Sequence, residues 1–275
     1  MWFAERRPFQ AALLEDRVIV CPAAARGASA QAQVLPCPAV AAGAKAWDAP
    51  VRALAQWLRE HGSARTRLQL FLSADFVRWQ LLDWPPTLAS PDEVDAYARL
   101  RFRTAFGASA DDWQLSLGPL LPGQPLPACA IDQGLLSALQ GLQAEGLARV
   151  HSATPYFAAA FDRWRRRVGR QTAWFGVAEP GHLTLGLLHR GLWRGLRSCR
   201  LPRDSQAAEA VWGALVPSLQ AQMGVSSGLE LPAQVPLYLA ACFEAPKASA
   251  WPGLVWLAPE GAKPARGVER MAWGV

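Results

Sequence analysis

The segment Gly224-Val225-Ser226-Ser227-Gly228 has the G-x-S-x-G spacing of the nucleophile elbow of serine hydrolases. In those enzymes a strand precedes the serine, and a histidine later in the chain acts as the general base. Here a helical pattern precedes the segment, and His189 is the last histidine. The sequence therefore predicts a helix end and a turn at this position, with no catalytic residue.

Three carboxylates, Asp92, Glu93 and Asp95, follow closely after Ser90 and Pro91. Neighbouring carboxylates can act as general acid and base. The spacing is also that of a capping box, in which Ser90 is the N-cap and Glu93 its partner three residues later. Negative charge in the first turn stabilises a helix through its dipole. We therefore interpret these carboxylates as a helix start and predict no catalytic residues here.

The histidines and cysteines show no metal-ligand spacing. The four histidines form no pair at helical spacing, and the five cysteines include no C-x-x-C. No glycine-rich phosphate loop precedes a lysine. We therefore expect neither a metal nor a cofactor. All cysteines except Cys37 lie in apolar, strand-like segments, which suits core residues of a protein in the reducing cytoplasm.

The chain carries 28 basic and 22 acidic residues, a net charge of +6, which is typical of proteins that bind nucleic acid, anionic lipid or an acidic partner. Arg greatly outnumbers Lys, so codon bias explains the charge equally well. Its densest basic run, residues 163–170, lies at the end of a predicted helix, where positive charge favours the helix dipole. No nucleic-acid-binding motif accompanies the run, so we expect no nucleic-acid partner. Residues 1–7 lack the apolar run of a signal peptide, and no apolar stretch approaches the ~20 residues of a membrane span. A cytoplasmic protein without its own membrane span is expected.

Hydrophobic periodicity and turn residues divide the first half of the chain into strands and helices. The predicted elements are a hairpin over 9–22, strands over 31–35, 68–73, 76–84 and 113–117, and helices over 47–61 and 90–106. Asp48 is the expected N-cap of the first helix. A tight turn is expected to join the strand over 68–73 to the next one.

Residues 128–167 alternate strand, helix, strand and helix, with Asp132 and Thr154 as the expected N-caps. This alternation predicts parallel strands covered by helices. From Thr172 the pattern returns to hairpins. The predicted elements there are strands over 174–178, 183–187, 192–201, 237–242 and 254–257, and a helix over 204–223 kinked at Pro217. The tail from Gly261 is predicted to be loose.

The order of elements therefore starts twice, although the two halves share no sequence identity. We predict an α/β protein with two lobes, mixed sheets and flanking helices. The first lobe spans residues 1–170 and includes an inserted subdomain at about 65–130. The second, shorter lobe spans residues 171–275, and a cleft separates the two.

Two segments carry a resemblance to a known family. The first runs from Ala130-Ile131-Asp132 through the helix that ends at Gly146, and then through the Pro155-started helix to Phe161. The second runs from Trp174 to Leu185. Together they resemble the actin-like (ribonuclease H-like) ATPase fold, and more narrowly the PilM and GspL type of assembly protein in type IV pili and type II secretion. The resemblance covers about residues 65–200.

The resemblance also implies how the chain departs from active ATPases. In active relatives the opening of the second lobe carries an Asp, a Gly and a hydroxyl residue around the nucleotide phosphates. Here Glu179 takes the acidic position, and Pro180 after it has no backbone N–H to donate. The first-lobe turn, residues 14–17, has no glycine, and no glycine pair stands near 239–241. A pseudo-ATPase is therefore implied. Its arrangement is closer to PilM, because proteins of the GspL type carry their own membrane span.

Three functions follow as hypotheses. The first is a non-catalytic scaffold of a pilus or secretion assembly platform that binds the short cytoplasmic tail of an inner-membrane partner in a groove or on a sheet edge. Self-association is left open. The second is a divergent active ATPase or small-molecule kinase, which nucleotide affinity would distinguish. The third is a nucleic-acid-associated protein, which a steep salt dependence of DNA affinity would support.

The partner-binding residues predicted for the scaffold are Trp193, Arg194 and Arg197. Trp193 follows the turn at Gly191 and stands among arginines, and Trp with Arg is the composition of many binding hot spots. A tryptophan packed on its own sheet is the alternative that stays open.

Overall fold

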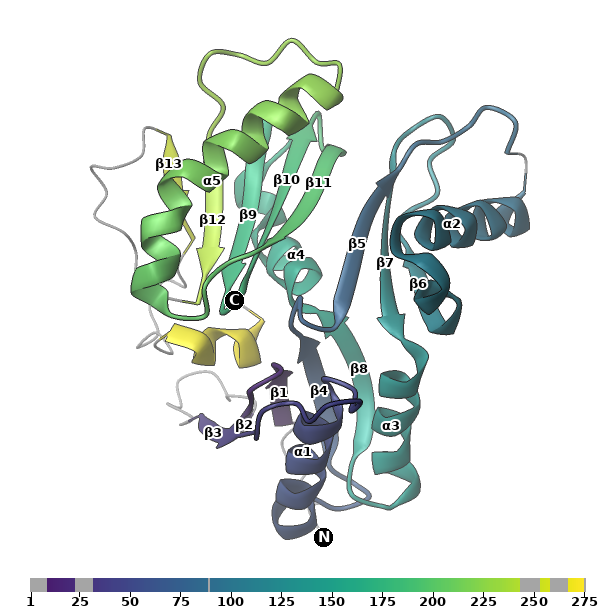
Figure 1. Ribbon diagram of the computed structural model, residues 1–275, viewed down its shortest axis with the longest axis vertical. Helices are drawn as coiled ribbons and strands as arrows, with labels where there is room; N and C mark the ends of the chain where they lie inside the picture. The colour runs from purple at the N-terminus through teal and green to yellow at the C-terminus, as the bar shows by residue number, and fades with distance from the viewer. Residues whose placement is uncertain (1–8, 23–31, 89, 243–252, 258–266, 275) are drawn as a thin grey trace, which may run out of the picture.

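The computed structural model describes residues 9–22, 32–88, 90–242, 253–257 and 267–274. Within them two five-stranded sheets and one three-stranded sheet form the framework, with helices packed on their faces (Figure 1). Both five-stranded sheets have the same order: when the strands of each sheet are numbered along the chain, the third, second, first, fourth and fifth strands lie side by side. The prediction that the order of elements starts twice is therefore confirmed.

The first sheet combines a β-meander with two parallel strands. Its strands, in sheet order, are β3 (Gln33–Pro36), β2 (Arg17–Pro22), β1 (Phe9–Leu13), β4 (Arg67–Leu72) and β8 (Arg149–Pro155). β1 is antiparallel to β2 and parallel to β4, and β4 is parallel to β8. Successive residues of β1 point to opposite faces, so Ala11 and Leu13 enter one core while Ala12 and Leu14 enter another.

The second sheet repeats this design. Its strands, in sheet order, are β11 (Leu192–Arg200), β10 (His182–His189), β9 (Ala173–Glu179), β12 (Leu237–Ala241) and β13 (Leu254–Trp256). The hairpins β9–β10 and β10–β11 are antiparallel, whereas β12 is parallel to β9 and to β13. β9 is buried on both faces, which explains its nearly continuous apolar sequence.

A three-stranded antiparallel sheet is inserted between β4 and β8. Its strands, in sheet order, are β5 (Val77–Leu82), β7 (Leu126–Asp132) and β6 (Trp113–Leu117). The helix α2 (Pro91–Phe106) covers one face with Val94, Ala98 and Phe102. A short 3₁₀ helix, η1 (Gly107–Asp112), follows α2 directly.

Helices enclose the two lobe sheets. α1 (Asp48–His61) and α3 (Gln133–Ala144) pack on one face of the first sheet, and α5 (Ser205–Ser226) packs on the outer face of the second. α4 (Tyr156–Val168) lies between the sheets (Figure 1). Its buried Tyr156 and Phe157 share one core with residues of β1 and β9. This shared core fixes the position of one lobe relative to the other. The lobe boundary expected between residues 170 and 171 falls in the link from α4 to β9.

One expectation about strand pairing is wrong. The predicted tight turn does join β4 and β5, and these two strands belong to different sheets. The pattern of residues 128–155 predicts parallel strands in one sheet, but β7 is antiparallel to its neighbours in the insertion and β8 is parallel to β4 in the first sheet. The strand–helix–strand pattern of residues 128–155 therefore connects two sheets and does not build a single one. Local sequence patterns cannot distinguish these cases, because both give the same alternation of apolar segments.

The helix starts are partly as predicted. Ser90 and Glu93 form the capping box, and Asp132 caps α3 through a hydrogen bond from the Gly134 N–H at 2.7 Å. Asp48, by contrast, is the first helical residue, and Trp47 is the N-cap. Thr154 is part of β8, and Pro155 is the N-cap of α4.

The end of the chain is more ordered than expected. Residues 261–266 lie outside the described part, but Gly267–Trp273 form the 3₁₀ helix η3. Met271 and Ala272 are fully buried in the core shared by the lobes, and the Arg270 guanidinium donates to the Ala241 carbonyl at 3.1 Å. The prediction of a loose tail is therefore wrong for these residues. In the described part of the chain, no helix combines the length and apolarity needed to span a membrane.

Candidate functional site

Titratable side chains gather where the turns of the two lobes meet. They come from the β1–β2 turn, the β4–β5 loop, the β9–β10 hairpin and the β11–α5 link. We name this set the interlobe cluster; it consists of Glu15, Asp16, Asp75, Glu179, His182 and Arg203.

Asp75 is the centre of the interlobe cluster, and its carboxylate is almost completely buried. Its Oδ2 accepts a hydrogen bond from the Glu15 backbone N–H at 3.1 Å and another from the Ser73 hydroxyl at 3.3 Å. Its Oδ1 accepts from Arg203 Nη2 at 2.9 Å. A buried charge is tolerated only when it is paired and hydrogen-bonded in this way.

Arg203 links the two lobes directly. Its guanidinium pairs with Glu15 and Asp75 and lies 3.7 Å from the Asp16 carboxylate. The stem of the side chain lies over Gly181, where an added Cβ would be only 3.3 Å from Arg203 Cγ. Gly181 has φ of +85°, which the tight β9–β10 turn requires. Arg203 therefore extends from the second-lobe turn to the first-lobe turn.

Burial changes the charge state of two members of the interlobe cluster. It raises the pKa of Glu179 from 4.5 to about 8, although the Ala74 N–H donates to this carboxyl group at 3.1 Å. It lowers the pKa of His182 from 6.5 to about 4, despite Asp75 Oδ1 at 3.3 Å from its Nδ1. Both groups are therefore neutral at pH 7. Water exclusion penalises a charge more than these neighbours compensate.

The charge of this region does not suit a triphosphate. Glu15, Asp16 and Asp75 are carboxylates, and Arg203 is already paired with them. The Asp16 carboxylate also forms an ion pair with Arg17, with Oδ2 and Nη2 2.6 Å apart. The resemblance to actin-like ATPases implies that the β1–β2 and β9–β10 turns correspond to the turns that hold the nucleotide phosphates in active relatives. Here an internal arginine and acidic side chains lie between them. Among the described residues, no group of His, Cys, Asp and Glu could hold a metal ion.

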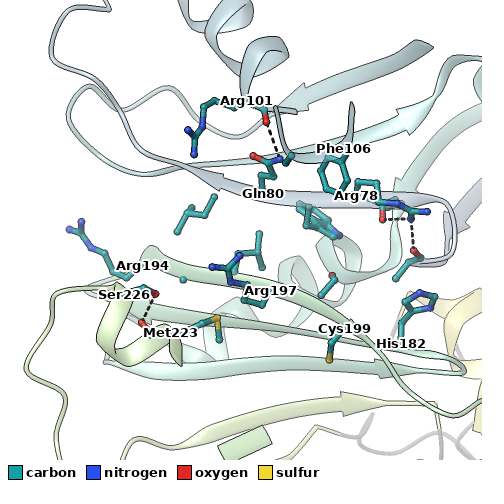
Figure 2. A pocket seen from close by; sticks show the side chains of 18 of the residues that line it. Arg78, Gln80, Arg101, Phe106, His182, Arg194, Arg197, Cys199, Met223 and Ser226 are labelled. Carbon is teal, nitrogen blue, oxygen red and sulfur yellow. Dashed lines mark hydrogen bonds between the residues drawn. The ribbon is translucent and has the colours of Figure 1, made fainter. Parts of the chain in front are cut away.

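A groove of ≈ 710 Å³ lies beside the interlobe cluster, between β5 of the insertion and β11 of the second lobe (Figure 2). Arg197 points from β11 toward β5, while Arg194 and Arg101 lie near one end and Arg78 and His182 near the other (Figure 2). The Arg78 guanidinium donates to the carbonyls of Ala74 and Asp75, at 3.3 and 3.1 Å. The β4–β5 loop therefore belongs to both the groove and the interlobe cluster.

The three predicted partner-binding residues lie on β11 but do not share one environment. Arg194 and Arg197 line the groove. Trp193 is half-buried, with ring centroids 4.6 Å from Phe161 and 5.6 Å from Phe157 on α4. Gly186 makes room for it, because a Cβ there would clash with the indole. The Trp193 ring thus packs between its sheet and α4, and its role in partner binding stays a prediction.

Sequence reasoning did not single out Asp75, His182 or Arg203. Their partners lie far away in the chain: Glu15 and Asp75 are 60 positions apart, and Asp75 and Arg203 are 128 positions apart. One signal was present: Ser73 and Asp75 are polar residues directly after a buried strand. The G-x-S-x-G segment lies at the end of α5, where Ser226 Oγ donates to the Met223 carbonyl at 3.2 Å, as predicted for a helix end.

Similar proteins are found by structure and not by sequence. No protein-family model matches the chain, and no curated protein matches it. One similar solved structure is described as the PilM–PilN type IV pilus biogenesis complex. It has a TM-score of 0.55 and 15% identity, over 86% of this chain and 82% of the other.

Two further structures cover nearly the whole chain. One is the cytoplasmic domain of EpsL, an inner-membrane component of the type II secretion system of Vibrio cholerae. It has a TM-score of 0.56 and 10% identity, over 96% of this chain and 92% of that one. The other is a Bacteroides thetaiotaomicron protein with an actin-like ATPase fold and unknown function. It has a TM-score of 0.56 and 11% identity, over 98% and 96% of the two chains. The chain therefore has the actin-like ATPase fold, and the resemblance inferred from the sequence is confirmed at the level of the fold.

Proposed function

We propose that the protein is a non-catalytic scaffold of a type IV pilus or type II secretion assembly platform. In this role it is cytoplasmic and is held at the inner membrane by the short cytoplasmic tail of a membrane partner. Its similarity in fold to PilM, seen in complex with PilN, and to the cytoplasmic domain of EpsL supports this role. A likeness of fold alone does not define function, so the site must carry the argument.

The observation that carries the proposal is the position of Arg203. Its guanidinium pairs with the first-lobe carboxylates and its stem packs on the second-lobe turn. A nucleotide would have to displace this side chain and would then face Glu15, Asp16 and Asp75. Pro180 removes one backbone donor from the turn that would bind phosphate. These features favour a protein whose two lobes are linked by their own side chains. They disfavour one in which a bound ATP links the lobes.

Titration calorimetry with ATP and Mg²⁺ tests this proposal. We expect no binding heat at about 1 mM ATP, the upper end of the usual range of substrate KM values. The melting temperature should also stay unchanged, because a ligand that binds only the folded state would raise it. An affinity on the order of 1 µM would overturn the proposal and favour the divergent ATPase or small-molecule kinase.

A further inference from the structure

The groove between the insertion and the second lobe is bordered by the edges of two strands. Its lining includes every residue from Val77 to Leu81 on β5 and every residue from Arg194 to Arg200 on β11. Side chains of successive strand residues point to opposite faces of a sheet. A cavity that touches all of them must therefore run along the strand edge and not over one face.

β5 and β11 lie next to each other, but they are not paired with each other as strands of one sheet. Among the described residues, β5 pairs only with β7, and β11 pairs only with β10. An edge strand presents unpaired backbone N–H and C=O groups, and an extended peptide can add to them as a further strand. The groove therefore offers main-chain hydrogen bonds to a segment that enters in an extended conformation.

The side chains around the groove select for negative charge. Five arginines line it and one acid, Asp83, does so; the arginines are Arg78, Arg101, Arg194, Arg197 and Arg200. None of the five forms an ion pair within the described part of the chain. The carboxylates of the interlobe cluster pair with Arg203 and not with these arginines. Among the described residues, Arg78 donates to backbone carbonyls and Arg194 to Gln124, whereas the guanidinium groups of Arg101, Arg197 and Arg200 have no such partner and are available for a ligand.

Arg194 lies at the end of the groove and is held there by the insertion. Its Nη2 donates to Gln124 of the insertion at 3.0 Å, which holds the side chain across the end of the groove. Its Nε is buried and has no hydrogen-bond partner among the described residues. A carboxylate in the groove would accept from the terminal N–H groups of this guanidinium, because Arg and carboxylate form charge-assisted hydrogen bonds.

The groove also has an apolar component. Trp79 and Leu81 of β5, Leu196 of β11, Phe106 of α2 and Met223 of α5 contribute to its lining. An extended segment places alternate side chains on opposite sides. A segment that combines acidic and apolar residues can therefore place carboxylates on the arginines and apolar groups on this lining.

We propose that this groove binds an extended acidic segment of a partner protein. Its main chain would lie along the open edge of β11, and its carboxylates would pair with Arg194, Arg197 and Arg101. A second copy of this chain is a poorer occupant, because each copy carries a net charge of +6. The proposal rests on the proposed scaffold function and adds to it the binding surface and the chemistry of the bound tail.

Fluorescence anisotropy with a labelled peptide tests the proposal. The probe alternates Glu and Val and matches the nine residues of β11 in length. We expect the double variant Arg101→Ala/Arg197→Ala to bind this peptide at least about tenfold more weakly than the original protein. This corresponds to a loss of about 1.4 kcal/mol in binding free energy. Both arginines are exposed and form no ion pair among the described residues, so the variant should fold; an unchanged circular dichroism spectrum and melting temperature check this. Arg166→Ala/Arg170→Ala, which removes the same charge on and just after α4, should bind as the original protein does.

Several results would contradict the proposal that the groove binds an acidic segment. One is an equal loss of binding in both double variants, which would show non-specific attraction of charge. Others are equal binding of a peptide with Lys in place of Glu, or of one with an N-methylated backbone. Displacement of the probe by a single-stranded oligonucleotide at equal concentration would also do so. If an inner-membrane partner binds Arg101→Ala/Arg197→Ala as tightly as the original protein, the groove is not the binding site. This result does not contradict the scaffold function. Tight binding of ATP would contradict the scaffold function, regardless of which peptide the groove binds.

Discussion

Glu179 takes the position at which the resemblance places an acidic residue beside the phosphates, yet its surroundings make it a neutral group. The side chain is fully buried and accepts a hydrogen bond from the Ala74 N–H. Burial raises its pKa to about 8. At pH 7 the group therefore carries a proton that it would lose on unfolding, and this proton makes stability depend on pH.

Glu179→Gln should remove this dependence. Between pH 4.5 and about 8 the folded state binds one proton more than the unfolded state, so stability should fall as pH rises through this window. His182, whose pKa is lowered to about 4, acts in the opposite direction, but only between about pH 4 and 6.5. We therefore expect the melting temperature of the original protein to fall between pH 6.5 and 8 and that of Glu179→Gln to stay nearly level. A fall of the same size in the variant would assign the proton to another group.

Among the elements, α2 shows how local chemistry sets the limits of a helix. The Glu93 N–H donates to Ser90 Oγ, and the Ser90 N–H donates to the Glu93 carboxylate, both at 3.3 Å. Pro91 at the first position has no N–H to satisfy, and Gly107 ends the helix. The helix in turn buries Phe102 against the insertion sheet, so the cap supports the subdomain that carries β5.

Ser90→Ala should lower the free energy of unfolding by on the order of 1 kcal/mol, because the first-turn N–H groups lose an acceptor. Chemical denaturation measures this change. Ser137→Ala provides a control, because Ser137 is exposed in the interior of α3 and Ala is the better helix former. Its stability should be equal to or slightly above that of the original protein. Binding of the acidic peptide should be unaffected in both variants, and a loss of binding in a stable Ser90→Ala variant would contradict the structural role.

At the scale of the whole molecule, two kinds of contact hold the lobes together. One is the apolar core in which Tyr156 and Phe157 of α4 meet both sheets. The other is the interlobe cluster, in which Arg203 and Glu179 of the second lobe bind Asp75 and Ala74 of the first. The polar contacts define the angle between the lobes more narrowly than apolar packing does, because hydrogen bonds depend on direction.

Arg203→Met should loosen this junction, since it leaves the buried Asp75 carboxylate without its cation. Breaking a buried pair costs 3–5 kcal/mol in other proteins, and the partial exposure of Arg203 reduces the expected loss to about 2 kcal/mol. Hydrogen exchange at the Glu15 and Ala74 amides should become faster, because both amides donate to side chains of the interlobe cluster. Arg165→Met breaks only an exposed pair with Asp162 and should change stability by less than about 0.5 kcal/mol. Loss of stability with unchanged exchange at both amides would place the effect of Arg203 elsewhere.

The sequence by itself determined the local elements: the hairpins β1–β2 and β9–β10, the caps at Ser90 and Asp132, and the repeated order of the two lobes. Each depends on residues within a few positions of one another, which is the range over which periodicity, turn residues and caps act. Arg194 and Arg197 were also found as binding candidates, because their residue type alone suits that role.

Only the tertiary structure decided which strands share a sheet and which side chains meet. It placed β4 and β5 in different sheets, set the edges of β5 and β11 opposite each other, and brought Arg203 to Asp75 across 128 residues. It also packed Trp193 against α4. These outcomes depend on how apolar faces are buried together and on how buried charges are paired. Neither can be read from neighbouring residues, because the free energy belongs to contacts that the chain makes only after it has folded.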